Sequence, residues 1–458
     1  MNKIGVYGLG VMGKSLAANI LSKGFSLSVC THNASKVDDF VKEYPGLQGY
    51  ADMKDFINSL EKPRKIVLMV TAGDVVDQVC AQMEPYLDEG DILIDCGNSF
   101  FKDTERRIKE LAEKNLHFIG SGVSGGEKGA LLGPSIMPSG DAKAYAELQE
   151  VFEAIAAHNE DGSSCCTYIG KGGSGHFVKM VHNGVEYADM QLIAEAYAML
   201  KEYYQDDQVK IQEAFKKMQA GKLNSYLFEI TCNIFDKKEG NDYLVDKILD
   251  VARQKGTGKW TAQVSLDYGV AIPSVIEAVQ ARFISSMKEK RVTIANQYPT
   301  NKANVELDLD ALEKALYLAK ICIYAQGFDL IYTVSKENNY DIDMKNLGVI
   351  WQNGCIIKSE FLKELVKTYT DEPALENVLL SNHFVKDIKE GIDALRDLVI
   401  QAKLCGLYIP VLNSTLDYFD GMSSEVLSTN MVQAQRDYFG AHTYERVDKE
   451  GTFHTEWE

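Results

Sequence analysis

The feature that most constrains this chain is a glycine-rich turn near its N-terminus, set between a buried strand and a helix. Lys3–Tyr7 is an apolar run of strand length, and Lys14–Lys23 has helical periodicity. Glycines at this junction permit a tight bend and let backbone N–H groups approach a pyrophosphate at the helix N-terminus. The strand before the turn and the helix after it favour a dinucleotide-binding role over a plain turn. The residues predicted to bind the dinucleotide here are Gly8, Leu9, Gly10, Val11, Met12 and Gly13.

The rest of the first 170 or so residues alternates short apolar runs with segments of helix length, such as Thr104–Lys114. This alternation predicts a doubly wound parallel sheet. The further predicted strands are Leu27–Cys30, Lys65–Val70, Ile92–Asp95 and Leu116–Ile119.

The pattern changes after the glycine-rich stretch 170–175. Long helical periodicity follows, for instance over Met190–Tyr203 and Leu309–Lys336, and the last ~30 residues are rich in aromatic side chains, which a solvated tail lacks. The predicted fold is therefore an α/β Rossmann-type N-terminal domain, a large all-α C-terminal domain and a C-terminal tail that docks on its own chain or on a neighbouring subunit. The predicted boundaries are 1–174, 175–428 and 429–458.

Composition narrows the class of protein. The formal net charge of -18 argues against a nucleic-acid partner, which requires a basic surface. No apolar run reaches the ~20 residues of a membrane span, so no membrane partner and a cytoplasmic location are expected. The nine cysteines include no CxxC pair, which favours neither a disulfide framework nor a zinc site, and no metal is predicted.

One apolar segment, residues 175–187, carries several groups capable of proton transfer and hydrogen bonding. Read as a helix, it places Lys179, His182, Asn183 and Glu186 within an arc of roughly 100°. Burial lowers the pKa of a lysine and raises that of a glutamate, which suits a base and an acid working near neutral pH. The alternative is a Lys–Glu pair on an exposed helix face.

Three further segments follow predicted strands at the carboxyl edge of the sheet, where ligands of open α/β sheets bind. Two are the turns 95–99 and 120–126, which offer backbone and side-chain donors. The third follows the second strand, where NAD-binding domains carry an acidic residue. This chain has neither an acid nor an arginine there; the candidate donors for a 2′-phosphate are His32, Asn33, Ser35 and Lys36.

These segments resemble the 6-phosphogluconate dehydrogenase family, and the resemblance extends from end to end. It rests on GLGVMG (8–13), GNS (97–99), GSGVSGGEKGA (120–130), GPSIMPSG (133–140), GHFVKMVHNGVEYADMQLIAEAY (175–197), KGTGKW (255–260) and QAQRDYFGAHTYER (433–446). The resemblance implies NADP-dependent oxidative decarboxylation of 6-phosphogluconate to ribulose 5-phosphate and CO2, in the pentose phosphate pathway and gluconate utilization.

The resemblance also implies roles for individual residues. Lys179 matches the general base and Glu186 the acid that protonates C1. Arg436 and His442 match tail residues that enter the active site of a partner subunit, which implies a homodimer. The other positions that match substrate-binding residues are Asn98, which also lies near the nicotinamide, Ser124, Gly125, Gly126, His182, Asn183, Tyr187, Lys255 and Arg282.

The chain departs from the family pattern after the second strand, where the family carries an arginine and this chain has His32. Loss of a permanent cation predicts weaker discrimination in favour of NADP, so that NAD is also expected to serve. Two other functions remain open at this point: a β-hydroxyacid dehydrogenase that does not decarboxylate, and a dinucleotide-binding protein without activity. The phosphate-binding positions argue against the first and the intact proton-transfer positions against the second.

Overall fold

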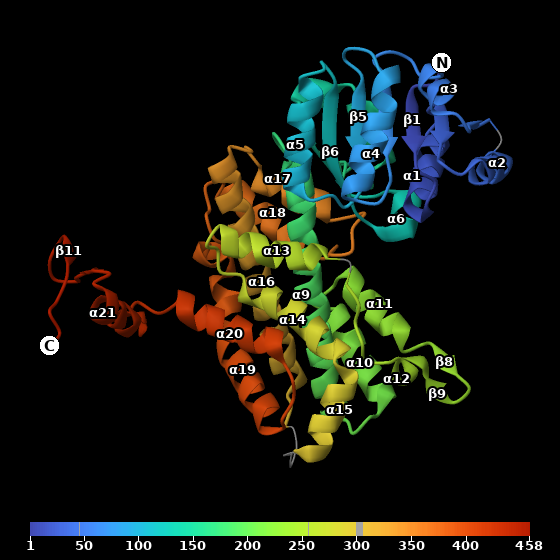
Figure 1. The fold of residues 1–458 in the computed structure, drawn as a ribbon. Coiled ribbons are helices and arrows are strands. Elements are labelled where there is room, and N and C mark those ends of the chain that lie inside the picture. The colour runs from blue at the N-terminus through green and yellow to red at the C-terminus, as the bar shows by residue number, and fades with distance from the viewer. Residues whose placement is uncertain (45, 255, 299–305) are drawn as a thin grey trace.

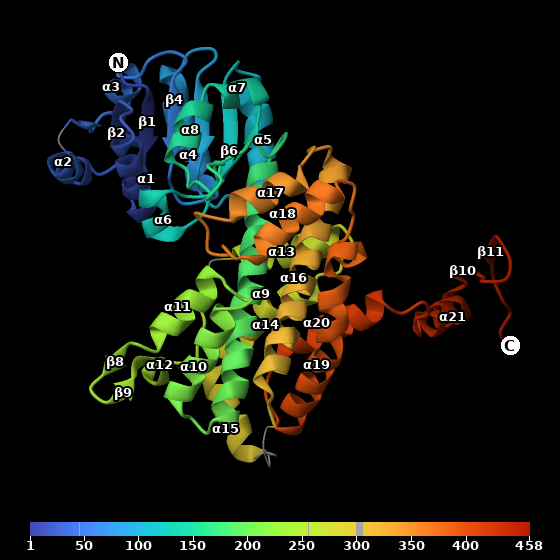
Figure 2. The same cartoon turned by 180° about the vertical axis from the view of Figure 1, so that it is seen from behind.

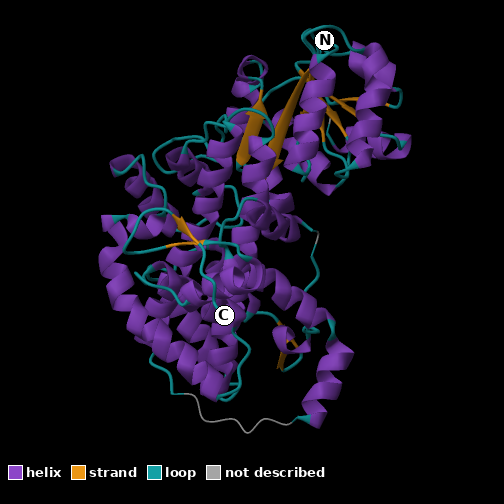
Figure 3. Cartoon of the chain, turned by 60° about the vertical axis from the view of Figure 1, so that its left-hand side comes forward, coloured by secondary structure: helices purple, strands orange, loops and turns teal. Residues whose placement is uncertain are grey.

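A computed structural model describes residues 1–44, 46–254, 256–298 and 306–458. A sheet domain lies at one end, a helical body occupies the middle, and a short tail extends to one side (Figure 1). Figure 3 shows the long strands gathered in the N-terminal domain and mainly helices, joined by loops, beyond it. The predicted α/β Rossmann-type domain and all-α domain are confirmed.

The N-terminal domain is built on one seven-stranded sheet in the order β3-β2-β1-β4-β5-β6-β7. Apolar clusters cover both faces of the sheet, which is why most of its strands read as continuous apolar runs. The strands are β1 Ile4–Tyr7, β2 Leu27–Cys30, β3 Gln48–Tyr50, β4 Lys65–Leu68, β5 Ile92–Asp95, β6 His117–Val123 and β7 Ile136–Gly140. The helices are α1 Val11–Ser22, α2 Ala34–Glu43, α3 Met53–Asn58, α4 Asp74–Met83, η1 Glu84–Tyr86, α5 Phe101–Ala112, α6 Gly126–Leu132, α7 Ala142–Ala146 and α8 Gln149–Ile155.

The sequence pattern predicted a sheet that is parallel throughout, but its last strand is antiparallel. Strand β7 runs antiparallel to β6, with Val123 opposite Ile136 and Ile119 opposite Gly140. The intervening α6 has seven residues and spans about 10 Å, whereas β6 spans roughly 23 Å. The connection is too short to return to the start of β6, so the next strand begins at the edge where β6 ended.

Strand β6 is also longer than predicted. Gly120 and Gly122 lie inside it rather than in a turn, and the turn begins only at Ser124. A Cβ atom on Gly122 would lie 2.4 Å from the Cβ of Lys179, and one on Gly120 would lie 2.5 Å from Thr104. These glycines therefore allow two helices, α5 with Thr104 and α9 with Lys179, to pack directly on the sheet.

The C-terminal domain is organised around two 30-residue helices, α9 Ser174–Tyr203 and α16 Leu309–Asn338. Helix α9 contacts β6 and β7 as well as α13, α14 and α16, so it joins the two domains (Figure 2). The other helices are α10 Gln208–Gln219, α11 Tyr226–Ile234, α12 Leu244–Lys247, α13 Thr257–Asp267, α14 Pro273–Ser286, α15 Lys288–Gln297, α17 Met344–Trp351, α18 Phe361–Asp371, η2 Val378–Leu380, η3 Asn382–Phe384, α19 Val385–Leu404 and α20 Pro410–Met422. A hairpin of β8 Lys238–Glu239 and β9 Asp242–Tyr243 is also present.

The tail consists of α21 Thr429–Gly440 and a hairpin of β10 Tyr444–Glu445 and β11 Thr452–Phe453. It stands away from the helical body in both views of the molecule (Figures 1 and 2). Of the two alternatives for the tail, docking on its own chain is not what this structure has. Its aromatic side chains remain open to solvent in the single chain; Phe439 is 73% exposed.

Two further findings concern membranes and cysteines. In the parts of the chain that the structure describes, no helix is long and apolar enough to cross a bilayer. All nine cysteines are buried free thiols.

Candidate active site

The N-terminal half of α9 brings four polar side chains together among apolar neighbours. Lys179 Nζ lies 3.4 Å from His182 Nδ1, which is in turn 3.3 Å from Asn183 Oδ1. Glu186 follows one turn later, with Oε2 3.8 Å from His182 Nδ1. Lys179 is 6% exposed and His182 is fully buried, so the alternative of an exposed charge pair on a helix surface is wrong.

Two segments distant in sequence hold His182 in place. Its Nε2 lies 3.3 Å from the hydroxyl of Ser124, in the turn after β6. Its ring meets the indole of Trp351 edge to face, with 5.4 Å between the ring centroids. In that turn Gly125 has φ 112° and lies so close to Gly354 that a Cβ would meet its carbonyl oxygen at 2.6 Å. The left-handed backbone and this close approach both require glycine.

Burial changes the protonation of this cluster. It lowers the pKa of Lys179, against the opposing effects of Glu186 and Cys355, and it raises the pKa of Glu186, against those of Lys179 and Arg282. Burial and the charge of Lys179 hold the pKa of His182 well below its usual value, so the imidazole is neutral. The shifts favour the neutral amine of Lys179 and the protonated carboxyl of Glu186, the pair of forms that acid–base catalysis requires.

A second group of residues surrounds Tyr187, which directly follows Glu186 on α9. The Arg282 guanidinium of α14 stacks on the Tyr187 ring, with its central carbon 3.5 Å from the centroid. Burial lowers the pKa of Arg282, and Glu186 and Tyr187 oppose that shift. A Cβ on Gly258 of α13 would lie 2.6 Å from the Tyr187 ring, so the first turn of α13 packs directly on this ring. Lys255, which the sequence placed here, lies outside the described residues.

The glycine turn between β1 and α1 fits a dinucleotide. Gly8 has φ 104° and lies against Met69, while a Cβ on Gly13 would lie 1.9 Å from the Gly8 carbonyl oxygen. A Cβ on Gly10 would have open space around it to 4 Å, and Val11 is 61% exposed. No side chain caps α1, which leaves its N-terminal N–H groups available to a pyrophosphate.

The residues after β2 form the N-terminus of α2. Asn33 caps this helix, accepting hydrogen bonds from the Ser35 N–H at 3.1 Å and the Ser35 hydroxyl at 2.8 Å. Asn33 and Ser35 therefore satisfy each other. His32 and Lys36 are exposed, which leaves them as the side chains with the most freedom to meet a charged group.

Asn98 is exposed on the turn after β5, and a buried network beneath it fixes that turn. Asp95 accepts hydrogen bonds from the Gly97 N–H at 3.0 Å and from the Ser99 hydroxyl at 2.5 Å. Arg107 NH1 lies 3.7 Å from Asp95 Oδ2, and its other nitrogens bind the Gly73 carbonyl and Asp77 at the start of α4. Arg107 thus links the loops that follow β4 and β5.

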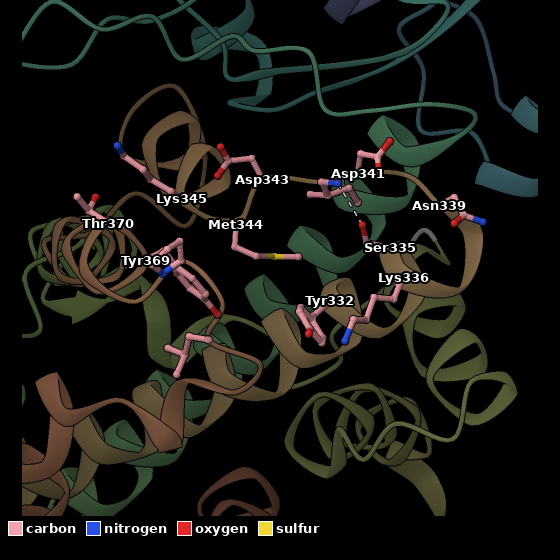
Figure 4. Close-up of a pocket in the computed structure, with 13 residues that line it drawn as sticks. Tyr332, Ser335, Lys336, Asn339, Asp341, Asp343, Met344, Lys345, Tyr369 and Thr370 are labelled. Carbon is pink, nitrogen blue, oxygen red and sulfur yellow. Dashed lines mark hydrogen bonds between the residues drawn. The ribbon is translucent and has the colours of Figure 1, made fainter.

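The structure does not bring Arg436 and His442 to this site, since both are exposed on the separate tail. A cavity of about 640 Å³ lies elsewhere, between the end of α16, α17 and α18, and is lined by Tyr332, Lys336 and Asp343 among others (Figure 4). It contains none of the predicted site residues. Among the described residues, no group of three or more His, Cys, Asp or Glu side chains is placed to hold a metal ion.

Sequence analysis missed several residues that shape the site. Trp351 packs on His182, and Cys355 is buried close enough to Lys179 to affect its pKa, yet both come from a segment about 170 residues downstream that carries no local signal. Asp95 was visible at the end of a strand, directly before a glycine turn. Its position at the carboxyl edge of the sheet was the signal that could have identified it.

Comparisons with known proteins agree with this geometry. The family model described as "NAD binding domain of 6-phosphogluconate dehydrogenase" matches residues 3–170, and "6-phosphogluconate dehydrogenase, C-terminal domain" matches residues 175–457. Proteins of Staphylococcus epidermidis and Staphylococcus aureus named "6-phosphogluconate dehydrogenase, decarboxylating" are each 50% identical over 462 residues, covering 99% of this chain and 99% of theirs.

A solved structure of Plasmodium falciparum 6-phosphogluconate dehydrogenase, described in its apo form, with its cofactor NADP+ and with its substrate 6-phosphogluconate, superimposes with a TM-score of 0.96. It is 42% identical and covers 99% of this chain and 100% of that one. The chain therefore belongs to the 6-phosphogluconate dehydrogenase family.

Proposed function

We propose that the chain catalyses the oxidative decarboxylation of 6-phospho-D-gluconate to D-ribulose 5-phosphate and CO2 with reduction of NADP. The observation that carries this proposal is the buried Lys179, 3.4 Å from His182 and on one helix face with Glu186. A base and an acid about two helical turns apart are suited to act on neighbouring carbons of one sugar acid.

In the proposed mechanism, NADP accepts a hydride from C3 of the substrate. Neutral Lys179 removes the proton of the C3 hydroxyl, which leaves a 3-keto acid. The protonated Lys179 then polarises the C3 carbonyl while the C1 carboxylate leaves as CO2, because the electrons of the broken bond flow toward that carbonyl. Glu186 donates a proton to C1 of the resulting enediol. No step needs a metal ion, since the lysine ammonium supplies the electrophile.

The other site residues are proposed to bind and orient the substrate and the cofactor. Asn98, Ser124, Gly125, Gly126, His182 and Asn183 are proposed to hold the sugar acid. Tyr187, Arg282 and Lys255 are proposed to bind its phosphate, and stacking on Tyr187 gives the Arg282 guanidinium a fixed plane that suits a phosphate dianion. Gly8 to Gly13 are proposed to bind the pyrophosphate of NADP, with support from the uncapped α1 N-terminus.

The site is proposed to be completed in a homodimer. Arg436 and His442, on the tail 429–458, are proposed to enter the active site of the partner, while residues 1–174 bind the dinucleotide and 175–428 bind substrate and form the dimer contact. Support comes from the aromatic tail, which stands clear of its own chain. A cytoplasmic location stays a prediction of the sequence.

The function is tested by a steady-state assay with 6-phosphogluconate that follows NADPH and released CO2 together. We expect one CO2 for each NADPH formed. NADPH without CO2 would favour a β-hydroxyacid dehydrogenase that does not decarboxylate, and neither product would favour a non-catalytic dinucleotide-binding protein.

Cofactor choice is expected to be relaxed, because His32 stands where the family carries an arginine. A hydrogen bond between charged groups contributes about 1.5–3 kcal/mol, so the substitution His32→Arg should raise kcat/KM for NADP by about tenfold or more and leave that for NAD within about twofold. The measurement is kcat/KM for both cofactors in both proteins. A strong NADP preference that His32→Arg does not change would assign the discrimination to Lys36 and Asn33 instead.

A further inference from the structure

One buried carboxylate connects distant parts of the tail. Of residues 429–458, all of which the structure describes, only Asp437 is buried. Its Oδ1 accepts hydrogen bonds from the Thr443 N–H at 3.0 Å and from His454 Nδ1 at 2.9 Å. Its Oδ2 accepts from the Thr455 N–H at 3.0 Å and from Trp457 Nε1 at 2.9 Å. Burial opposes ionisation, but these hydrogen bonds outweigh it and lower the pKa of Asp437 to about 2.

The tail buries no apolar side chain, and the rings of Tyr438, Tyr444, Phe453 and Trp457 contact one another only at its surface. The side chains of Met431, Tyr438 and Phe439 are 63%, 55% and 73% exposed. A segment of 30 residues is too short to bury enough apolar surface for independent stability. The four hydrogen bonds of Asp437 instead join helix α21, the turn after it and the last residues of the chain.

The same contacts control where Arg436 and His442 lie. Gln433 accepts a hydrogen bond from Arg436 NH1 at 3.1 Å and donates one to the Thr443 carbonyl at 2.6 Å, so it connects the arginine to the turn. Within that turn Thr443 has φ 63°, which a β-branched residue rarely adopts. The Asp437–Thr443 hydrogen bond holds this strained residue, which directly follows His442.

From this geometry we propose that Asp437 is the positioning residue of the tail: it holds Arg436 and His442 in one preformed unit that enters the substrate site of a second copy of this chain. Asp437 itself does not touch the substrate. The inference rests on the proposed function of the tail. Preforming the unit removes the ordering cost that a flexible peptide would incur on insertion.

The test is Asp437→Asn, which keeps the shape of the side chain but places an amide where two of the four donors point. We expect KM for 6-phosphogluconate to rise about tenfold, kcat to change less than about threefold and KM for NADP to stay the same, because a misplaced Arg436 would bind the anionic substrate less well in the ground state and in the transition state alike. Asp448→Asn is the matched control, since Asp448 pairs with Arg446 at the exposed hairpin, and it should match the wild type. Circular dichroism checks that the body remains folded.

A double-mutant comparison separates positioning from other roles. If Asp437 acts through Arg436 and His442, then the double variant Arg436→Met/His442→Asn and the triple variant that adds Asp437→Asn should have equal KM values within about twofold. A further rise in KM when Asp437→Asn is added to the other substitutions would overturn the inference. An unchanged KM in Asp437→Asn alongside a raised KM in Arg436→Met would also overturn it. An unchanged KM in Arg436→Met would instead show that the proposed function of the tail is wrong.

Discussion

Replacing Lys179 with Met is expected to lower kcat by about 10³-fold or more, the upper part of the range for a general base and acid. Lys179 has two successive tasks in the proposed mechanism, removal of the hydroxyl proton and polarisation of the carbonyl, and methionine can perform neither. The Kd for NADP should not change, because Lys179 is on α9 whereas the proposed pyrophosphate site is at the start of α1. Steady-state assays and cofactor titration provide the two measurements.

The matched control is Lys171→Met, which removes an exposed lysine that pairs with Asp341 just before α9 begins. It should retain wild-type turnover. The substitution at position 179 also replaces a buried amine with an apolar side chain of similar length, so loss of folding is not expected. Turnover within tenfold of wild type in Lys179→Met would remove the central step of the mechanism.

Replacing Glu186 with Gln is expected to lower kcat by about 10²-fold or more, through a different step. Glutamine keeps the shape of the side chain but cannot donate a proton to C1, whereas Lys179 can still support oxidation and loss of CO2. Rapid mixing should therefore show a burst of NADPH in Glu186→Gln, followed by slow turnover. Lys179→Met should show no burst.

The pH dependence gives an independent check on Glu186. Burial raises its pKa, so the protonated form that the mechanism needs persists to higher pH and is lost as pH rises through that pKa. The corresponding alkaline limb of kcat should disappear in Glu186→Gln. Glu213→Gln, an exposed change on α10, should keep both the limb and the rate. Wild-type turnover in Glu186→Gln would mean that another group supplies the proton.

Local sequence patterns were sufficient to predict the domain organisation of the chain. The glycine turn, the strand spacing and the later helical periodicity predicted a Rossmann-type domain followed by helices, and the structure has both. The spacing of Lys179, His182, Asn183 and Glu186 likewise placed them on one helix face, because the helical period depends only on backbone geometry. The reaction was inferred from the sequence motifs that the chain shares with the family.

Errors arose where long-range packing overrides local propensity. Gly120 and Gly122 read as a turn because glycine is frequent in turns, but they lie inside β6, where α5 and α9 leave no room for a Cβ. Strand β7 runs antiparallel because α6 is too short to return the chain to the start of β6. The pattern of apolar residues in a strand does not contain this distance. Trp351 and Asp95 contribute to the site through tertiary contacts, which leave no periodic pattern in the sequence.

The sequence by itself determined which elements form and which side chains can carry out proton transfer and phosphate binding, because both depend on residue type and on spacing over one or two helical turns. Only the tertiary structure decided whether those groups are buried, and hence how their pKa values shift, since desolvation depends on neighbours far away in the chain. It also decided that Arg436 and His442 stand apart from the site of their own chain, on a tail in which Asp437 is the buried side chain.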